Sequence, residues 1–550
     1  MLLTLVIFIP LVLGLVAAAF APAKQMKIWA LGIVLLDLVA ALAAALFFNW
    51  GGIDPQTVII QGEAVETAFQ LRASVAWPIF EGVRYTVGVD SLSMILILLA
   101  AFIGVFGVLC SFSAIKHREK EFYLFLLILQ TGIMLTFSAL DMFVFYVGFE
   151  LMLIPLYFMI GIWGSGNRVY ATMKFVVYTL VGSLMMLLAF IWVYFNAPIQ
   201  TFSYELLLQQ AQTAEIFRGA VWPFLGILIA FLIKIPLFPF HTWLPDAHTE
   251  APTAGSVILA AVLLKTGVYG ILRFNIPLFP DVAVAFAPSL TWLSAIAIVY
   301  GAMAAMVQKD MKRLVAYSSV SHMGFITLGI FSFNGPGMDG AIIQMVNHGI
   351  STGGLFLVVG MIYERRHTRL LSEFGGLAAR VPVMAALAMV MVLSSVGLPG
   401  LNGFVGEFPI LMGSMQNTPI LSFSNEPGSL YALFGMRHYT WLIALIAATG
   451  VIWGAVYLLL MYQKTFFGKL TNPKNQKMAD VNFREMGMLV ALSAAALILG
   501  LFPNLIFKPV RSYSEPALAM IAKHLEGYET PPERDVMVAE AAADDHGHGH

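Results

Sequence analysis

Long apolar runs separated by short polar segments follow one another along most of the chain. Fourteen of these runs have the length of about 20 residues that crosses a bilayer as an α-helix. We therefore expect an all-α polytopic membrane protein with about 14 transmembrane helices, numbered here spans one to fourteen. Two segments interrupt the pattern: a polar loop over residues 50–87, between spans two and three, and a polar tail over residues 509–550.

One short pattern occurs twice, as FLIKIP at 231–236 and FVGEFP at 404–409. Both read Phe-x-x-charge-x-Pro, and the second follows the glycine-rich GLPGLNG. Proline inside a helix removes a backbone hydrogen bond and clashes with the preceding turn, so we expect breaks at Pro236, Pro399 and Pro409. Spans seven and twelve would then be discontinuous, a feature of transporter binding sites.

The two copies lie five spans apart, so they cross the membrane in opposite directions. This predicts two inverted five-helix repeats, formed by spans four to eight and spans nine to thirteen. The expected order is 1–113 for spans one to three with the loop at 50–87, 121–274 for the first repeat, 286–465 for the second, 486–508 for span fourteen and 509–550 for the tail.

The positions of the basic residues orient the chain. Nineteen Lys and Arg residues fall in loops opposite the termini, against nine on the terminal side. Basic loops stay on the cytoplasmic side, so both termini are expected outside, on the periplasmic side of a bacterial inner membrane.

Composition excludes several classes of protein. The 550 residues are 59% hydrophobic and 11% charged, and the net charge is −1 with no long basic block, which argues against nucleic acid as a partner. The single cysteine, Cys110, cannot hold an iron–sulfur cluster. No nucleotide-binding motif is present, so we expect that the chain itself binds no cofactor.

At least four ionisable residues lie inside predicted spans, among them Glu150, Lys234, Lys265 and Glu407. A charge at the centre of a spanning helix costs about 2.5–3.5 kcal/mol on insertion scales, so each is a candidate functional residue. We expect Lys234 to pair with Glu150, and the two lysines to lie close enough to promote each other's deprotonation. Protons could then hop along the line. The alternative is a set of buried ion pairs that only hold helices together.

His322 and His348 lie in predicted spans ten and eleven, between the two broken helices. Histidine titrates near neutrality, which suits a proton relay, although a single buried histidine is more often a core residue with satisfied hydrogen bonds. We favour the relay.

Metal-binding side-chain types occur in two places. The segment HTWLPDAHTEAP carries His241, Asp246, His248 and Glu250, but its two prolines favour a helix cap and an ordered loop over a zinc site. His546, His548 and His550 at the end of the tail are better explained by a solvated terminus. We expect no metal.

The stretch KIPLFPFHTWLPDAHTEAPTAGSVILAAVLLKTGVYG, residues 234–270, resembles the signature of the antiporter-like membrane-arm subunits of respiratory complex I and of the related multi-subunit sodium/proton antiporters. The resemblance covers roughly residues 120–470, without the loop or the tail. Glu407 is similar to the M-type chains of complex I, the counterpart of mitochondrial chain four, because the other types usually carry lysine there. L-type chains also continue beyond this core with a lateral helix.

By this resemblance Glu150, Lys234 and Lys265 match the glutamate and lysines of spans five, seven and eight, and Glu407 matches the distal proton acceptor. His322 and His348 match the region that connects them. The resemblance implies a proton-translocating, non-redox subunit of NADH:quinone oxidoreductase, driven by quinone reduction elsewhere in the complex. NADH, FMN, iron–sulfur clusters and quinone would be bound by partner subunits, and the L- and N-type chains would be neighbours.

Two other functions stay open. One is a subunit of a sodium/proton antiporter or of a membrane-bound hydrogenase, which shares the core but not the energy source. The other is a structural membrane scaffold in which the buried charges only hold helices together.

Overall fold

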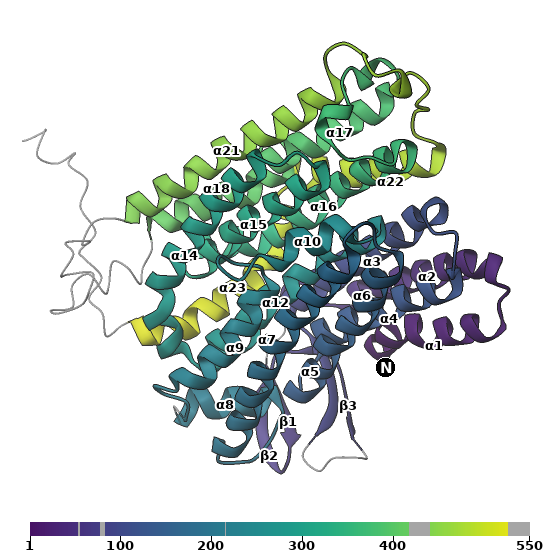
Figure 1. The fold of residues 1–550 in the computed structure, drawn as a ribbon. Helices are drawn as coiled ribbons and strands as arrows, with labels where there is room; N and C mark the ends of the chain where they lie inside the picture. Colours follow the sequence, from purple (N-terminus) through teal and green to yellow (C-terminus); the bar gives the residue numbers. More distant parts are fainter. Residues whose placement is uncertain (53–54, 78–82, 215, 417–439, 526–550) are drawn as a thin grey trace, which may run out of the picture.

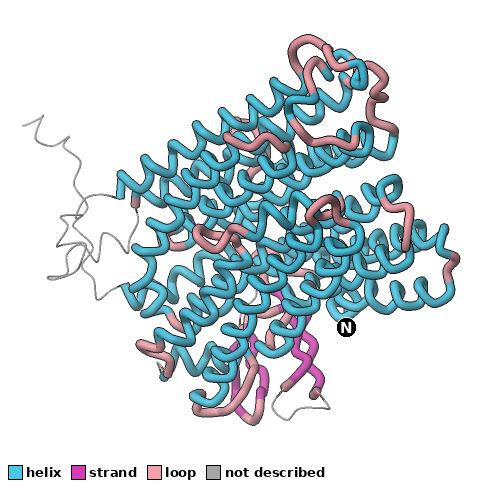
Figure 2. Tube along the Cα trace, in the orientation of Figure 1, coloured by secondary structure: helices cyan, strands magenta, loops and turns pink. Residues whose placement is uncertain are grey.

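Long helices lie side by side and run in one general direction through the molecule (Figures 1 and 2). The computed structural model describes residues 1–52, 55–77, 83–214, 216–416 and 440–525. Within these residues, 11 helices are long and apolar enough to cross a membrane. They are α1 (Leu2–Phe20), η1 with α2 (Met26–Phe47), α3 (Ser91–Ala114), α4 (Glu119–Ser138), α5 with α6 (Met142–Leu151 and Leu153–Trp163), α7 (Arg168–Asn196), the helix Thr253–Leu278, α14 (Pro280–Met306), α16 (Gly335–Arg366), α21 (Thr440–Phe466) and α22 (Phe483–Leu501).

The three other expected spans are also helical, but they are short or polar. Span seven, expected at 222–240, contains α9 (Val221–Lys234), and the short α10 (Trp243–Glu250) follows it. Span ten is α15 (Met311–Ile330), which begins with a charged turn. Span twelve is divided into α17 (Pro382–Val396) and α18 (Asn402–Met415).

The fold is not purely helical, because the expected polar loop at 50–87 contains two antiparallel hairpins. One pairs β1 (Gln56–Ile60) with β2 (Glu63–Thr67), and the other pairs β3 (Gln70–Ala76) with β4 (Arg84–Val89). The strands are only five to seven residues long and lie among polar residues, so the sequence pattern did not reveal them. The start of the expected tail is also ordered, as the helix α23 (Asn504–Leu525).

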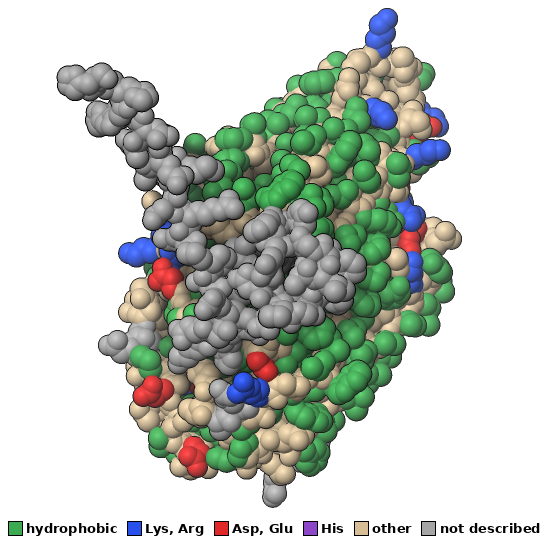
Figure 3. All heavy atoms as spheres, turned by 90° about the vertical axis from the view of Figure 1, so that its left-hand side faces the viewer, with side chains coloured by type: hydrophobic (Ala, Val, Ile, Leu, Met, Phe, Trp, Pro, Cys, Tyr) green, Lys and Arg blue, Asp and Glu red, His purple; other side chains and the backbone are tan. Residues whose placement is uncertain are grey.

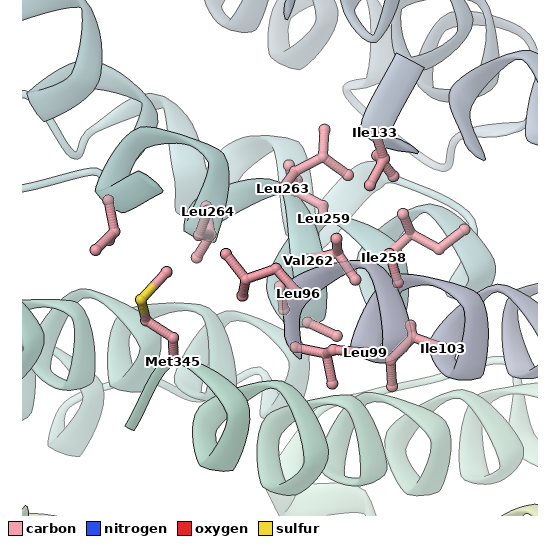
Figure 4. Close-up of a cluster of buried hydrophobic side chains, with 14 of the residues drawn as sticks. Leu96, Leu99, Ile103, Ile133, Ile258, Leu259, Val262, Leu263, Leu264 and Met345 are labelled. Carbon is pink, nitrogen blue, oxygen red and sulfur yellow. The ribbon is translucent and has the colours of Figure 1, made fainter. Parts of the chain in front are cut away.

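Two helices form the centre of the molecule. The most apolar windows of Thr253–Leu278 and of α16 are completely buried, so these helices have neighbours on every side. Figure 4 shows part of this core, where leucine and isoleucine side chains of α3 meet those of the helix Thr253–Leu278 and Met345 of α16. Because lipid does not reach them, any polar group on these helices must find its partner inside the protein.

The outer helices have an apolar surface. Large hydrophobic side chains of α1, α2, α7, α21 and α22 are exposed, as expected for a surface in contact with lipid. In Figure 3 hydrophobic side chains spread over the described surface, while charged ones gather near its margins. This distribution agrees with a multi-pass membrane protein.

The two ends of the helices form two polar faces. One, which we call the terminal face, carries the start of α1, the hairpins and α23; Tyr85 on β4 donates to Thr4 on α1, and Ser512 on α23 donates to the Trp50 carbonyl. At the other, which we call the opposite face, ends of helices distant in the sequence meet, for example through the hydrogen bond from Ser113 of α3 to Glu364 of α16.

Candidate functional site

The first break in a helix lies next to Lys234. Helix α9 ends at that residue, two positions before Pro236, whose ring nitrogen has no hydrogen to donate. A carbonyl freed by the break, that of Ile233, accepts a 2.9 Å hydrogen bond from the Trp243 indole. The break is thus satisfied inside the protein, and it leaves the ammonium group of Lys234 at the end of a helix, where the dipole favours a cation.

Lys234 is 2% exposed and lies over an aromatic ring rather than against a carboxylate. Its Nζ is 4.7 Å from the centroid of Phe149, the residue before Glu150. Glu150 belongs to α5, which ends one residue later, and its charge acts on Lys234. Among the described residues no direct ion pair joins them, so a charge interaction alone links the two expected partners.

Lys265 lies at the centre of the buried helix Thr253–Leu278. The turn before it widens into the π-helical segment η2 (Leu259–Leu263), and a second such segment, η3 (Ile271–Asn275), follows α12 (Leu264–Gly270). Such π segments often mark functional sites. The Lys265 Nζ donates to the Ala260 carbonyl at 2.6 Å and contacts the His348 Nδ1 at 2.6 Å.

The two predicted histidines continue the line from Lys265. His348 on α16 and His322 on α15 are both buried, and their ring centroids are 5.5 Å apart. The His348 Nε2 has no hydrogen-bond partner among the described residues.

Glu407 on α18 closes the line. Its Oε1 lies 3.0 Å from the His322 Nδ1 and accepts a 3.0 Å hydrogen bond from the Gln344 amide. The other ring nitrogen of His322, Nε2, is 3.2 Å from the Ser395 hydroxyl. Lys265, His348, His322 and Glu407 therefore form one consecutive series of buried titratable groups.

The second break differs from the expected one. Helix α17 ends at Val396, before Pro399, but α18 continues through Pro409, so the predicted break at Pro409 is wrong. The helix is instead interrupted at the glycines of GLPGLNG, where Gly397 adopts a left-handed conformation with φ +81°. A Cβ on Gly397 would lie 2.7 Å from the Glu407 Oε2, so the break lies beside the carboxylate in space although ten residues separate them.

No direct contact between the two lysines is present among the described residues. Charge interactions join Lys234 to Glu150, and Lys265 to His248 and His348. The helices of the two lysines nevertheless touch closely: a Cβ on Gly267, in α12, would lie 2.8 Å from the Phe231 carbonyl of α9. The predicted line is therefore not bridged by a direct contact between Lys234 and Lys265.

The acidic residues of the segment 241–250 point to partners other than a metal. Asp246 pairs with Lys174 at 2.8 Å and with Arg313 at 3.5 Å, and Glu250 accepts a 2.8 Å hydrogen bond from Ser165. The described residues contain no cluster of three His, Cys, Asp or Glu side chains that could hold a metal ion. The histidines of the tail lie outside the described residues.

His248 is a residue that the sequence reasoning considered only as a metal ligand. It is fully buried, stacks on Phe356 with ring centroids 4.6 Å apart, and has no hydrogen-bond partner on either nitrogen among the described residues. Charge interactions link it to Lys265 and to Lys312. A histidine twelve residues after Pro236 was the available signal.

A cavity of about 620 Å³ opens on the opposite face near this histidine. It is lined by Glu250, Thr253, Lys312 and side chains of the loops around them. Lys312 is buried and donates a 2.5 Å hydrogen bond to the Ala251 carbonyl. The sequence analysis counted Lys312 among the loop residues, but in the structure it lies in the first turn of α15.

The family of the chain is evident from comparison with known proteins. Residues 139–426 match the model of the NADH:quinone oxidoreductase/Mrp antiporter transmembrane family. Residues 56–136 match the amino terminus of NADH-ubiquinone oxidoreductase chain 4. The second match corrects the expectation that the resemblance starts near residue 120 and leaves out the loop at 50–87.

Curated relatives span most of the chain. NADH-quinone oxidoreductase subunit M of Rickettsia conorii is 38% identical over 468 residues, which are 85% of this chain and 89% of the relative. The same subunit of Rhodobacter capsulatus is 38% identical, over 92% of this chain and 94% of its own length. That of Escherichia coli is 38% identical, over 80% and 83%.

Solved structures share the fold. A chain of respiratory complex I from Thermus thermophilus with bound NADH superposes with a TM-score of 0.79 at 32% identity, covering 95% of this chain and 100% of that one. A chain of the Mrp complex from Dietzia has a TM-score of 0.76 at 19% identity, with 95% and 99% covered, which shows a common fold and no more.

Proposed function

The chain belongs to the family of NADH-quinone oxidoreductase subunit M, and from this membership we propose that it moves protons through the buried line described above. It is an antiporter-like subunit of the membrane arm of complex I, in the bacterial plasma membrane. The proposal concerns what its own residues contribute to that complex.

The series Lys265, His348, His322 and Glu407 is the observation that carries the proposal. Two of its three steps are direct contacts, of 2.6 Å and 3.0 Å, and the middle step is a pair of rings with centroids 5.5 Å apart. Each member can hold or release a proton, and burial makes an excess charge on any one of them costly. A proton entering at one end therefore favours release at the other.

Glu150 and Lys234 form the first part of the path. The carboxylate acts on the lysine without touching it, so a small movement of α5 changes how strongly the ammonium group is held. A proton released from Lys234 would cross to Lys265 where α9 and α12 meet at Gly267. Neither this step nor the one from Glu150 to Lys234 is bridged by a direct contact among the described residues, so these two steps would set when protons enter the line.

The proposed membrane topology of the chain has fourteen spans, in which spans four to eight and spans nine to thirteen form two inverted repeats. The broken helices would then lie in corresponding places, with Lys234 beside one break and Glu407 beside the other. Both termini would face the periplasm, since nineteen basic residues lie on the opposite side and nine on the terminal side.

The chain is proposed to carry no redox chemistry of its own. Quinone reduction in partner subunits would supply the energy, and NADH, FMN and iron–sulfur clusters would be bound there. The L- and N-type antiporter-like chains are the proposed neighbours in the membrane arm. The absence of nucleotide and cysteine-cluster motifs in the sequence supports this division.

The test is to replace Lys265 by methionine in the assembled complex. Methionine keeps the length of the side chain and removes the proton-carrying group, so NADH-driven proton uptake into proteoliposomes should fall. Lys120→Met is the matched control, because Lys120 also donates to a backbone carbonyl, that of Ala18 at 3.0 Å, but lies far from the line.

Assembly is checked by the amount of intact complex in mild detergent. Reduced pumping with Lys265→Met and wild-type pumping with Lys120→Met would support the relay. Wild-type pumping by an intact Lys265→Met complex would refute it and leave the buried charges with a structural role only.

A further inference from the structure

An isolated carboxyl group lies in the middle of the N-terminal helices, outside the line described above. Asp37 is residue 12 of the 22 residues of α2 and is 0% exposed. Neighbouring side chains on the other side of the same helix, Leu36 and Val39, are 46% and 61% exposed. The aspartate thus points away from the apolar surface, into the interface of α2 with α1, α3 and α4.

One neutral side chain is its partner. The Gln130 amide of α4 donates a 3.2 Å hydrogen bond to the Asp37 Oδ2 and another of 3.2 Å to the Ala100 carbonyl of α3. A Cβ on Gly104 of α3 would lie 2.8 Å from the Gln130 Oε1, so the glycine leaves room for this amide. The other carboxyl oxygen, Oδ1, has no partner among the described residues.

Among the described residues of the neighbouring helices, no counter-ion lies at this depth. Helix α1 has no titratable side chain, and α3 has only Cys110. The titratable residues of α4 are Glu119, Lys120, Glu121 and Tyr123, all in its first turns, and the other one of α2 is Lys27. At 1.5 Å per residue, Lys27 is about 15 Å along the axis from Asp37 and Glu121 is about 13 Å from Gln130.

A buried carboxylate without a cation is far more costly than a neutral carboxylic acid. For an ordinary aspartic acid in water, the protonated form is about a thousand times less populated than the carboxylate at neutral pH. An unpaired charge in an apolar interior is disfavoured much more strongly than that. The hydrogen bond at Oδ2 suits the carbonyl oxygen of an acid, and Oδ1, which faces no donor, is where the proton would sit.

We propose that Asp37 is a second proton-binding site of this chain: a carboxylic acid that keeps its proton at neutral pH, joins α2 to α3 and α4 through Gln130, and reacts with apolar carbodiimides. In that reaction the carboxyl oxygen bonds to the central carbon of the reagent while the carboxyl proton moves to a reagent nitrogen, giving an acylisourea. A carboxylate lacks that proton and does not react in this way. The site is independent of the proton line.

The test uses the whole complex in membranes. Dicyclohexylcarbodiimide is added between pH 6 and 8, and the modified residue is located by mass spectrometry. The proposal predicts that Asp37 is modified and that the extent of modification does not change over this pH range or on addition of sodium ions. The modification should be absent from the Asp37→Asn variant. Suppression by sodium would overturn it in favour of a cation site that includes the Asp37 carboxylate.

If the reagent does not reach Asp37, infrared difference spectra of wild-type and Asp37→Asn complexes show whether the carboxyl group is protonated. The proposal predicts a wild-type band from a protonated carboxyl, shifted in heavy water, while carboxylate bands in its place would overturn it. Glu407→Gln separates this site from the relay, because it should leave Asp37 protonated whatever it does to pumping. Asp37→Asn, which keeps a neutral side chain of the same shape, should pump at the wild-type rate.

Discussion

The end of the proton line at Glu407 allows a quantitative prediction. The Oε1 atom of this residue contacts the His322 Nδ1 and the Gln344 amide, each at 3.0 Å. Glu407→Gln keeps the size of the side chain and an oxygen that can accept both hydrogen bonds. It removes the negative charge that stabilises a protonated His322, and it removes a group that takes up protons.

The magnitude follows from the contact that is changed. A hydrogen bond to a charged group contributes about 1.5–3 kcal/mol, and 1.36 kcal/mol corresponds to a tenfold change in population. If protons pass between His322 and Glu407, transfer through this subunit should therefore slow about 10- to 150-fold in the variant.

The assay is NADH-driven proton uptake by complex I in proteoliposomes, measured with the rate of quinone reduction. Glu364→Gln is the matched control, because Glu364 lies on the opposite face and is bonded to Ser113 rather than to the line. Wild-type proton uptake by an intact Glu407→Gln complex would show that His322 does not depend on this carboxylate during turnover, and the reasoning would be wrong.

Two further predictions concern packing. Gly406→Ala should lower proton uptake about as much as Glu407→Gln, since a Cβ on Gly406 would lie 3.0 Å from the Gln344 backbone and push Glu407 away from its partners; proton uptake of the assembled variant measures this. Arg273→Met should lower the unfolding free energy by about 3–5 kcal/mol, because it leaves Asp90 without the 2.7 Å ion pair that fastens two helices at the terminal face; thermal unfolding in detergent measures this.

Each of these has its own control. Gly32→Ala introduces the same methyl group where nothing lies within 4 Å, and it should pump normally. Glu121→Gln breaks an exposed ion pair with Arg118 and should change stability by less than about 1 kcal/mol. Equal effects of Gly406→Ala and Gly32→Ala on pumping, or of Arg273→Met and Glu121→Gln on stability, would contradict the packing argument.

The sequence was informative where a single residue decides the local structure. Helix α9 ends at Lys234 because proline cannot donate, and a lysine in an apolar run is conspicuous. The second break was predicted only in part. Pro409 lies inside α18, and the chain is interrupted at Gly397 and its neighbours instead. Proline alone does not show which of two nearby breakers interrupts a helix.

The contacts of the site could not be read from the sequence. His348 and Lys265 are 83 residues apart, and His322 and Glu407 are 85 residues apart, so only the packing of α15, α16 and α18 shows which of them meet. Asp37 was overlooked although it stands out in its apolar span in the same way as Lys234. The hairpins were missed because strands of five to seven residues in a polar loop give a weak signal.

The central claim is that Lys265, His348, His322 and Glu407 act as one path, and a double-mutant comparison of proton uptake tests it most directly. Groups that work in series are strongly non-additive, so the loss in the double variant Lys265→Met/Glu407→Gln should be no greater than the larger of the two single losses. Single losses that multiply in the double variant, with the complex intact, would mean that the residues act independently and would contradict the single path.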